Sequence, residues 1–294
     1  MITTVGVGIG LGFIAMLSWG FGDFLIQKST RKVGDWETLF IMSLVGAALL
    51  LPFVWNKLPS LLSLGNFDLS ILLGTGLILF VAALLDFEAL RRGKLAVVEP
   101  IWSLEIPVAA FLAFFLLSER ITILQIVLIV SLIVCLILVG IRQKNIRLVM
   151  FLEKGVLVAF LGAIFMGAAN FFMGWGGRIT DALMINFLTD SFMVITTGIY
   201  LLGHGRLKRT FRDFKNNYGV LLPMSIADKI AWIAFVFAMI LAPIAVATAL
   251  SESYIIIAVL LGLLINREKL HYHQKVGLIG AIVTAVILAV ITSG

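Results

Sequence analysis

One constant register relates two distant stretches of this chain. Residues 95–139 align with residues 244–288 without a gap, and identical residues coincide at Leu112 and Leu261, Glu119 and Glu268, and Gln125 and Gln274. An internal repeat of this kind constrains the architecture more than any single motif. Because each copy belongs to a unit of five apolar spans, an odd number, the second unit must enter a membrane from the opposite side, which defines an inverted repeat.

Composition and span length indicate an all-α integral membrane protein. Of all residues 61% are apolar and 13% are charged, which argues against a soluble globular domain. Runs of roughly 20 apolar residues can cross a hydrocarbon core of ~30 Å as helices, whereas barrel strands need only about 10 alternating residues. We predict ten transmembrane helices, over residues 5–27, 37–55, 70–90, 96–117, 122–141, 153–177, 182–202, 217–241, 244–266 and 271–292.

These spans divide into two inverted five-helix repeats, residues 1–146 and residues 147–294. The longest connecting segments, 142–152 and 203–216, leave no room for a folded soluble domain. The sequence contains no GxxxxGK[ST] phosphate-binding loop, which argues against an ATP-driven pump within this polypeptide. The lone cysteine, Cys135, has no partner for an intrachain disulfide, and we interpret it as a small core residue.

The positions of the cations predict the topology. The loops after odd-numbered helices hold 18 of the 22 lysines and arginines, the loops after even-numbered helices hold 3, and Lys229 lies within a span. Short loops rich in lysine and arginine stay in the cytoplasm, so both termini are predicted to be extracytoplasmic in the cell membrane. The net charge of +6 is explained by anionic lipid beside these loops and requires no nucleic acid.

Acidic side chains within the spans are the first candidate functional residues. A charge at membrane depth costs roughly 2.5–3.5 kcal/mol on insertion scales, so such residues should face a packed interior or water. Glu105 and Glu252 differ by only two positions in the repeat register. We predict that the deep set binds substrate or a coupling ion: Glu105, Asp190, Asp228 and Glu252.

Lys229 is the only cation predicted to lie deep in a span. Neighbours on a helix point about 100° apart, so Lys229 need not pair with Asp228 and can neutralise Asp190 or a carboxylate of the other half. A purely structural buried ion pair is the alternative for Asp228 and Lys229.

Aromatic residues accompany two of these acids at helical spacing. Trp102 precedes Glu105 by three residues, and Trp232 follows Asp228 by four, so each pair shares a helix face. A carboxylate beside an aromatic ring suits an ammonium group, through cation–π attraction of about 1–2 kcal/mol when desolvated. The alternative is chance proximity in a chain with 11% aromatic residues.

Three further residues are predicted to line a cavity rim or gate. Asp23 and Asp86 lie about one turn inside the basic boundary, where a structural capping role is the alternative. Pro107 falls in the middle of a predicted helix, where it would leave the Ser103 carbonyl without its usual donor. The expected kink could move during gating or remain static.

Several local motifs resemble a known family. Ser18-Trp19-Gly20, the run from Pro100 to Pro107, and the corner Ser118-Glu119-Arg120-Ile121-Thr122, repeated less faithfully at Asn266-Arg267-Glu268, resemble the EamA type of the drug/metabolite transporter superfamily. The resemblance implies two fused five-helix halves and a secondary carrier for small metabolites, commonly an exporter, that works by alternating access. It also implies packing and capping roles for the corner glutamates.

Together these observations predict a secondary active transporter that exports a small polar or amine-bearing metabolite with proton or sodium coupling. Burial disfavours the charged carboxylates, which suits proton exchange. The alternative is a passive channel or a lipid or metabolite facilitator with the same acid-lined cavity.

Because no clustered catalytic set is present, we expect no enzyme activity and no cofactor. The three histidines lie in loops, so no metal site is predicted. The expected partners are the substrate and membrane lipid, and a monomer is expected, with a dimer as the alternative.

Overall fold

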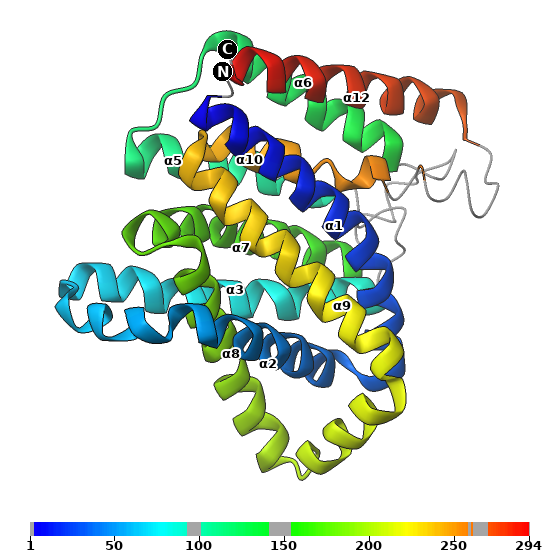
Figure 1. Cartoon of the computed structure of the whole chain (residues 1–294). Coiled ribbons are helices and arrows are strands. Elements are labelled where there is room, and N and C mark those ends of the chain that lie inside the picture. Colours follow the sequence, from blue (N-terminus) through cyan, green and yellow to red (C-terminus); the bar gives the residue numbers. More distant parts are fainter. Residues whose placement is uncertain (1–2, 93–100, 141–153, 258–259, 261–269, 294) are drawn as a thin grey trace.

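The computed structural model describes residues 3–92, 101–140, 154–257, 260 and 270–293. Within these ranges every regular element is helical (Figure 1). The elements are α1 (Thr4–Val33), α2 (Asp35–Val54), the 3-10 helix η1 (Trp55–Ser63), α3 (Asn66–Arg92), α5 (Glu105–Leu117), α6 (Ile123–Gly140), α7 (Lys154–Ile179), α8 (Ala182–Gly203), α9 (Leu207–Leu241), α10 (Ile244–Ser251) and α12 (Tyr272–Ser293).

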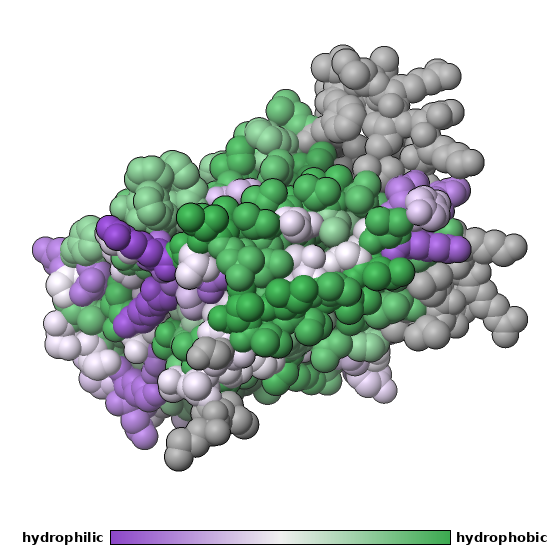
Figure 2. Space-filling model, turned by 90° about the horizontal axis from the view of Figure 1, so that it is seen from above, coloured by the Kyte–Doolittle hydropathy of each residue, from purple (hydrophilic) through white to green (hydrophobic). Residues whose placement is uncertain are grey.

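The helices have the length and composition of membrane spans. Among the described residues seven helices are long and apolar enough to cross a bilayer, and three shorter apolar helices accompany them, Glu105–Leu117, Ile123–Val139 and Ile244–Ile257. Figure 2 shows hydrophobic side chains over the middle of one face and hydrophilic ones toward its two ends. The all-helical membrane architecture is therefore confirmed, while the number of ten spans stays a prediction.

Several predicted spans coincide with helices, but the spans 96–117 and 244–266 are interrupted by turns and lie partly outside the described residues, and α9 begins earlier than predicted. Residues 182–202 and 271–292 were predicted to be spans, and α8 and α12 match them within one residue. The segment 203–216 was predicted to be a linker, and this is wrong from Leu207 onward, where α9 begins. The reason is that its leucine, lysine and arginine residues favour a helix although they are too polar to read as a span.

The contacts between the two halves are themselves related by the repeat. Helix α1 packs along α9 as α7 packs along α3, while α2 contacts α8 and α6 contacts α12. The correspondence extends to single glycines. A Cβ atom on Gly20 would lie 2.7 Å from the Ile257 Cβ atom, and one on Gly167 would lie 2.7 Å from the Val108 Cβ atom. Since 108 and 257 are matched by the repeat register, α1 and α7 make equivalent close approaches.

A helix is interrupted at the same register position in each half. A turn at Ser103–Leu104 precedes α5, and a turn at Glu252–Ser253 follows α10. Pro107 was predicted to lie in mid-helix, and the structure corrects this: it is the third residue of α5. There its missing N–H is one of the four that have no partner within a helix. Ile256 stands at the matching position, so proline is not required for the break.

The two chain ends lie together at one end of the molecule (Figure 1), where the Thr3 hydroxyl donates to the Ser293 carbonyl over 3.0 Å. At the far end of α1, the buried Glu37 carboxylate pairs with Arg206 at a distance of 2.5 Å. Sequence reasoning missed Glu37 because it lies at the first turn of α2, where acids commonly stabilise a helix N-terminus.

Candidate functional site

The two deep glutamates meet at one amide group. The Asn170 Nδ2 atom of α7 donates to Glu105 Oε2 over 3.2 Å and to Glu252 Oε1 over 3.3 Å. All three residues are buried, with exposed fractions of 4% for Glu105, 7% for Glu252 and 1% for Asn170. An amide nitrogen carries two N–H donors, one for each carboxylate. The structure thus brings together the glutamates that the repeat register had related.

Local backbone structure explains why these carboxylates reach the interior. Glu105 is the first residue of α5 and Glu252 is the C-cap residue that follows α10, so both stand at the interruptions in the two halves. Interrupted helices occur in membranes where the freed backbone groups line a site or are buried in protein. Helix α7 passes both interruptions, and Gly167 lets its backbone approach the Glu105 carbonyl.

A second polar cluster lies between α2, α8 and α9. Lys229 Nζ lies 2.6 Å from Asp190 Oδ2, and it donates to Asn186 Oδ1 over 3.5 Å. Lys229 is 4% exposed and Asp190 is 6% exposed. Gly46 of α2 packs beside both charged side chains, and a Cβ atom there would lie 2.5 Å from Lys229 Cε and would collide with Asp190 Oδ2. Lys229 therefore pairs with Asp190, one of the two partners that the sequence suggested.

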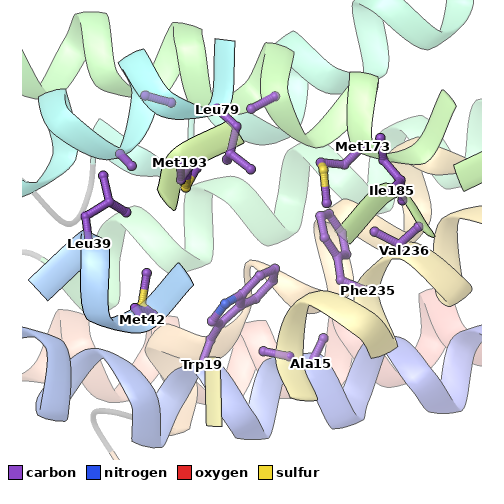
Figure 3. Packing of buried hydrophobic residues seen from close by; sticks show 14 of the residues in the cluster. Ala15, Trp19, Leu39, Met42, Leu79, Met173, Ile185, Met193, Phe235 and Val236 are labelled. Carbon is purple, nitrogen blue, oxygen red and sulfur yellow. The ribbon is translucent and has the colours of Figure 1, made fainter. Parts of the chain in front are cut away.

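Asp228 lies in an aromatic frame beside this ion pair. The indole N–H groups of Trp232 and Trp19 donate to its side chain, and Asp228 is 5% exposed. The Trp19 ring meets the Trp232 ring edge-on, with centroids 5.3 Å apart, and it meets Phe235 at 5.1 Å. Figure 3 shows Trp19 directed into the core between Met42 and Phe235. Trp19 thus links α1 to the acid of α9.

The second cluster is not repeated. Continuing the offset of the aligned stretches 95–139 and 244–288 back into α3 and α9 places Leu79 at the position of Asp228 and Phe80 at that of Lys229. Leu79 is buried among apolar neighbours and Phe80 packs against the same core. The glutamate pair is therefore a feature of both halves, whereas the Asp228 and Lys229 cluster belongs to the second half alone.

Other predicted site residues lie elsewhere. Trp102 is buried against Ala89 of α3 and Ala163 of α7, and its indole N–H has no hydrogen-bond partner among the described residues. Asp86 is half-buried in α3. Its Oδ1 atom lies so close to Gly162 of α7 that a Cβ atom added there would collide with it. Asp23 lies in α1, but its side chain is outside the described part of the structure. The gating roles of Asp23, Asp86 and Pro107 stay predictions.

A cluster of hydrogen bonds ties the halves together at the end where the termini lie. Arg178 in the last turn of α7 donates to the Met239 carbonyl over 2.7 Å and to Glu119 Oε1 over 3.3 Å. Glu119 Oε1 also accepts from the Ile244 backbone N–H over 2.9 Å. Glu119 therefore caps α10, which agrees with the capping role expected from the family resemblance.

Sequence reasoning missed Asn170 and Trp19 as site residues. Asn170 interrupts the apolar run of α7, and amides in such runs commonly join helices. Trp19 was noted only as part of a motif. Within the described residues no group of three or more metal-ligating side chains is present.

The interrupted helices, the duplicated packing and the buried carboxylates define a multi-pass helical membrane protein made of two related halves. The chain belongs to the EamA-like transporter family, whose model matches residues 6–141 and again residues 153–290. The resemblance to the drug/metabolite transporter superfamily is thereby confirmed.

Among functionally curated proteins there is no match. Solved structures share the fold, and 29 chains match. One of them, titled only "Crystal structure of protein", superposes with a TM-score of 0.75 over 97% of this chain and 97% of its own length, at 14% identity. This similarity shows the fold alone.

Proposed function

We propose that this protein is a secondary active carrier that exchanges protons for an amine-bearing metabolite by alternating access, and that it works as an exporter in the cell membrane. The observation that carries the proposal is the bridge from Asn170 to Glu105 and Glu252. It joins the interrupted helices of both halves at one buried point, so that a change in protonation there acts on both halves together.

The glutamate pair is assigned to proton coupling. Two ionised carboxylates on one neutral amide repel each other in a poorly solvated site, and one shared proton relieves that repulsion. Without the proton, the pair favours separation of the two interrupted helices. With it, the closed arrangement of Glu105, Asn170 and Glu252 is favoured. A proton thus has different affinities for two states, which coupling requires.

Asp228 is assigned to the substrate ammonium group. Lys229 is paired with Asp190, and its charge also acts on Asp228, whose own hydrogen-bond donors are two neutral indole N–H groups. One lysine beside two buried carboxylates leaves the cluster one positive charge short when all three groups are ionised, which favours a bound cation. The rings of Trp19, Trp232 and Phe235 supply cation–π partners for a substituted amine. Because this cluster lacks a counterpart in the first half, it suits recognition rather than the alternation common to both halves.

The topology proposed from the charges places both termini outside the cell. The Arg178 and Glu119 contacts then lie at the outer face, and they favour a state closed toward the outside. Alternating access requires that this network opens when the substrate leaves.

The test begins with metabolite profiling of cells with and without the protein, followed by transport of the enriched amine in liposomes of purified protein. The proposal predicts saturable transport, acceleration by an opposing pH gradient, and counterflow. A rate that rises linearly with concentration and shows no counterflow would instead establish a passive channel. Asp228→Asn should raise KM for the amine, whereas Leu79→Met, at the position that matches Asp228 in the first half, should leave KM unchanged.

A further inference from the structure

The first third of α9 forms a basic arm at the opposite end of the molecule from the termini. Helix α9 has 35 residues, about 52 Å at 1.5 Å per residue, whereas a hydrocarbon core is only ~30 Å thick. The backbone leaves helical geometry at Asn217, with φ −124° and ψ 20°. Figure 1 shows the segment before this point turned away from the rest of α9. We call Leu207–Asn216 the α9 arm.

Three cations form one stripe on the α9 arm. Lys208, Arg212 and Lys215 are spaced by four and three residues, so they lie on one helix face. All three are exposed, and none has an ion-pair partner in the described part of the chain. The neighbouring Arg209 differs, because it pairs with Asp213 over 3.4 Å. The stripe is thus a charged surface that no acidic side chain of the described residues neutralises.

An exposed apolar face runs beside these cations. Phe211 is 50% exposed and Tyr218 is 65% exposed, and the exposed side chains of Leu222, Ile226 and Ile230 continue the face beyond Asn217. In a membrane protein such a continuous apolar surface contacts acyl chains. Tyrosine is favoured where the acyl region meets the headgroups. Phe211 and Tyr218 therefore place the α9 arm at the membrane interface, with Lys208, Arg212 and Lys215 at headgroup height.

The other face of the arm fixes it to the protein. Leu207 and Phe214 pack against the main apolar core, and Thr210 is fully buried. At the border of the two faces the half-exposed Phe211 ring also meets Phe40 of α2 edge-on at 5.9 Å. At the bend, Asn217 Nδ2 donates to the Asp213 carbonyl over 3.0 Å, which supplies a donor for that backbone group. The arm is therefore held by α2 and the core, and the cationic stripe has a defined position.

We propose that the α9 arm is a binding site for anionic phospholipid headgroups, with Lys208, Arg212 and Lys215 as phosphate ligands and the Phe211 and Tyr218 face against the acyl chains. The argument is charge complementarity with an anionic leaflet at the depth that the aromatic residues set. The site is distinct from the proposed transport site, although both belong to α9, which carries Asp228 eleven residues beyond Asn217.

The test is lipid retention measured by native mass spectrometry on the intact protein in mixed phosphatidylglycerol and phosphatidylcholine. The wild type should retain phosphatidylglycerol selectively, and Lys208→Gln/Arg212→Gln/Lys215→Gln should lose that selectivity. A matched control is Arg31→Gln/Lys32→Gln, which removes two exposed cations from the last turn of α1 and should keep it. Equal loss in both variants, or none in the arm variant, would overturn the proposal.

A second measurement separates a lost site from a misfolded protein. In nanodiscs of phosphatidylcholine alone, the arm variant should melt at the wild-type temperature. Phosphatidylglycerol should raise the melting temperature of the wild type and leave that of the arm variant unchanged. If the melting temperature of the triple variant in phosphatidylcholine lies below that of the wild type, the charge-preserving variants Lys208→Arg/Lys215→Arg and Arg212→Lys are measured instead. These conservative changes should preserve selective retention, and its loss in them would contradict a site defined by positive charge.

Discussion

Lys229 Nζ lies 2.6 Å from Asp190 Oδ2, and both side chains pack against the backbone of Gly46, where no Cβ atom can be placed without a collision. The buried ion pair of α8 and α9 is therefore set by a glycine on a third helix. Close packing of α2 against α8 and α9 therefore holds the Lys229 charge in its place beside Asp228.

Gly46→Ala should destabilise the protein. Overpacking costs about 1–3 kcal/mol, and the higher helix propensity of alanine returns at most about 1 kcal/mol. Thermal unfolding in detergent should show a lowered midpoint. Gly74→Ala is the control, since a Cβ atom on this α3 glycine meets no atom within 4 Å, and it should leave the midpoint unchanged or raised. Equal effects of the two substitutions would contradict the packing argument.

Lys229→Met should destabilise more than Asp190→Asn. Removal of the lysine leaves Asp190 and Asp228 buried without a cation, and breaking a buried pair costs about 3–5 kcal/mol. Removal of the Asp190 charge still leaves Asp228 as a neighbouring carboxylate for the lysine. The double variant Lys229→Met/Asp190→Leu should recover part of the loss, because apolar pairs often replace buried ion pairs. Chemical denaturation measures all three, and a double variant less stable than Lys229→Met alone would refute the assignment.

The repeat register predicted Glu105 and Glu252 as a pair, yet it could not predict how they meet. Their two-position offset matters little, because one stands just after its helix interruption and the other within it. Charge distinguishes Glu105 and Glu252 within the apolar runs, whereas the amide of Asn170 carries none, so sequence reasoning did not identify it. The sequence feature that could have identified Asn170 is its position as a single polar residue among the apolar residues around it in α7. Trp19 could not be placed from spacing, since its partner Asp228 lies on a helix of the other half.

The positions of the two helix interruptions could not be predicted from local sequence. Pro107 indicated a disturbance in the first half, but it lies after the break rather than at it. In the second half Ile256 gives no such signal, and the interruption is nevertheless in register. Tertiary contacts from α1 and α7 at Gly20 and Gly167, which local propensity does not encode, accompany both interruptions.

Arg178→Gln should lower stability by about 1–3 kcal/mol, the cost of leaving buried acceptors unsatisfied. The arginine donates to the Met239 carbonyl at the end of α9 and pairs with Glu119, which is 14% exposed in its side chain. Arg120→Gln changes the exposed cation next to Glu119 and should leave stability near that of the wild type. Thermal unfolding compares the two variants. Identical unfolding midpoints would contradict a stabilising role of Arg178 in the contacts with Glu119 and Met239.

Asp181 predicts a stability loss at low pH. Partial burial raises the pKa of Asp181, but the hydrogen bond from Lys57 and the backbone donors Met184 and Leu183 outweigh it, so the pKa lies below its usual value. A lowered folded-state pKa stabilises the protein above the unfolded value of about 3.9, and this contribution is lost as the pH falls through the folded-state pKa. Unfolding midpoints between neutral and acidic pH should therefore fall more in the wild type than in Asp181→Asn.

Asparagine keeps the helix cap, whereas Asp181→Ala should cost about 1 kcal/mol at all pH values. This comparison separates the charge of Asp181 from its capping of α8. Because Asp181 and Lys57 are partly exposed, solvent screening keeps the charge effect small. A pH dependence that Asp181→Asn retains in full would assign it to other groups.

The central claim is that Glu105 and Glu252, joined by Asn170, couple proton movement to transport. The most direct test measures internal pH in liposomes while the amine identified by profiling is transported. The wild type should move protons in fixed ratio to the amine, whereas Glu105→Gln and Glu252→Gln should abolish amine-driven proton movement, and Asn170→Ala should change the pH at which transport is half-maximal. Proton movement and a pH profile unchanged in all three variants would contradict the account.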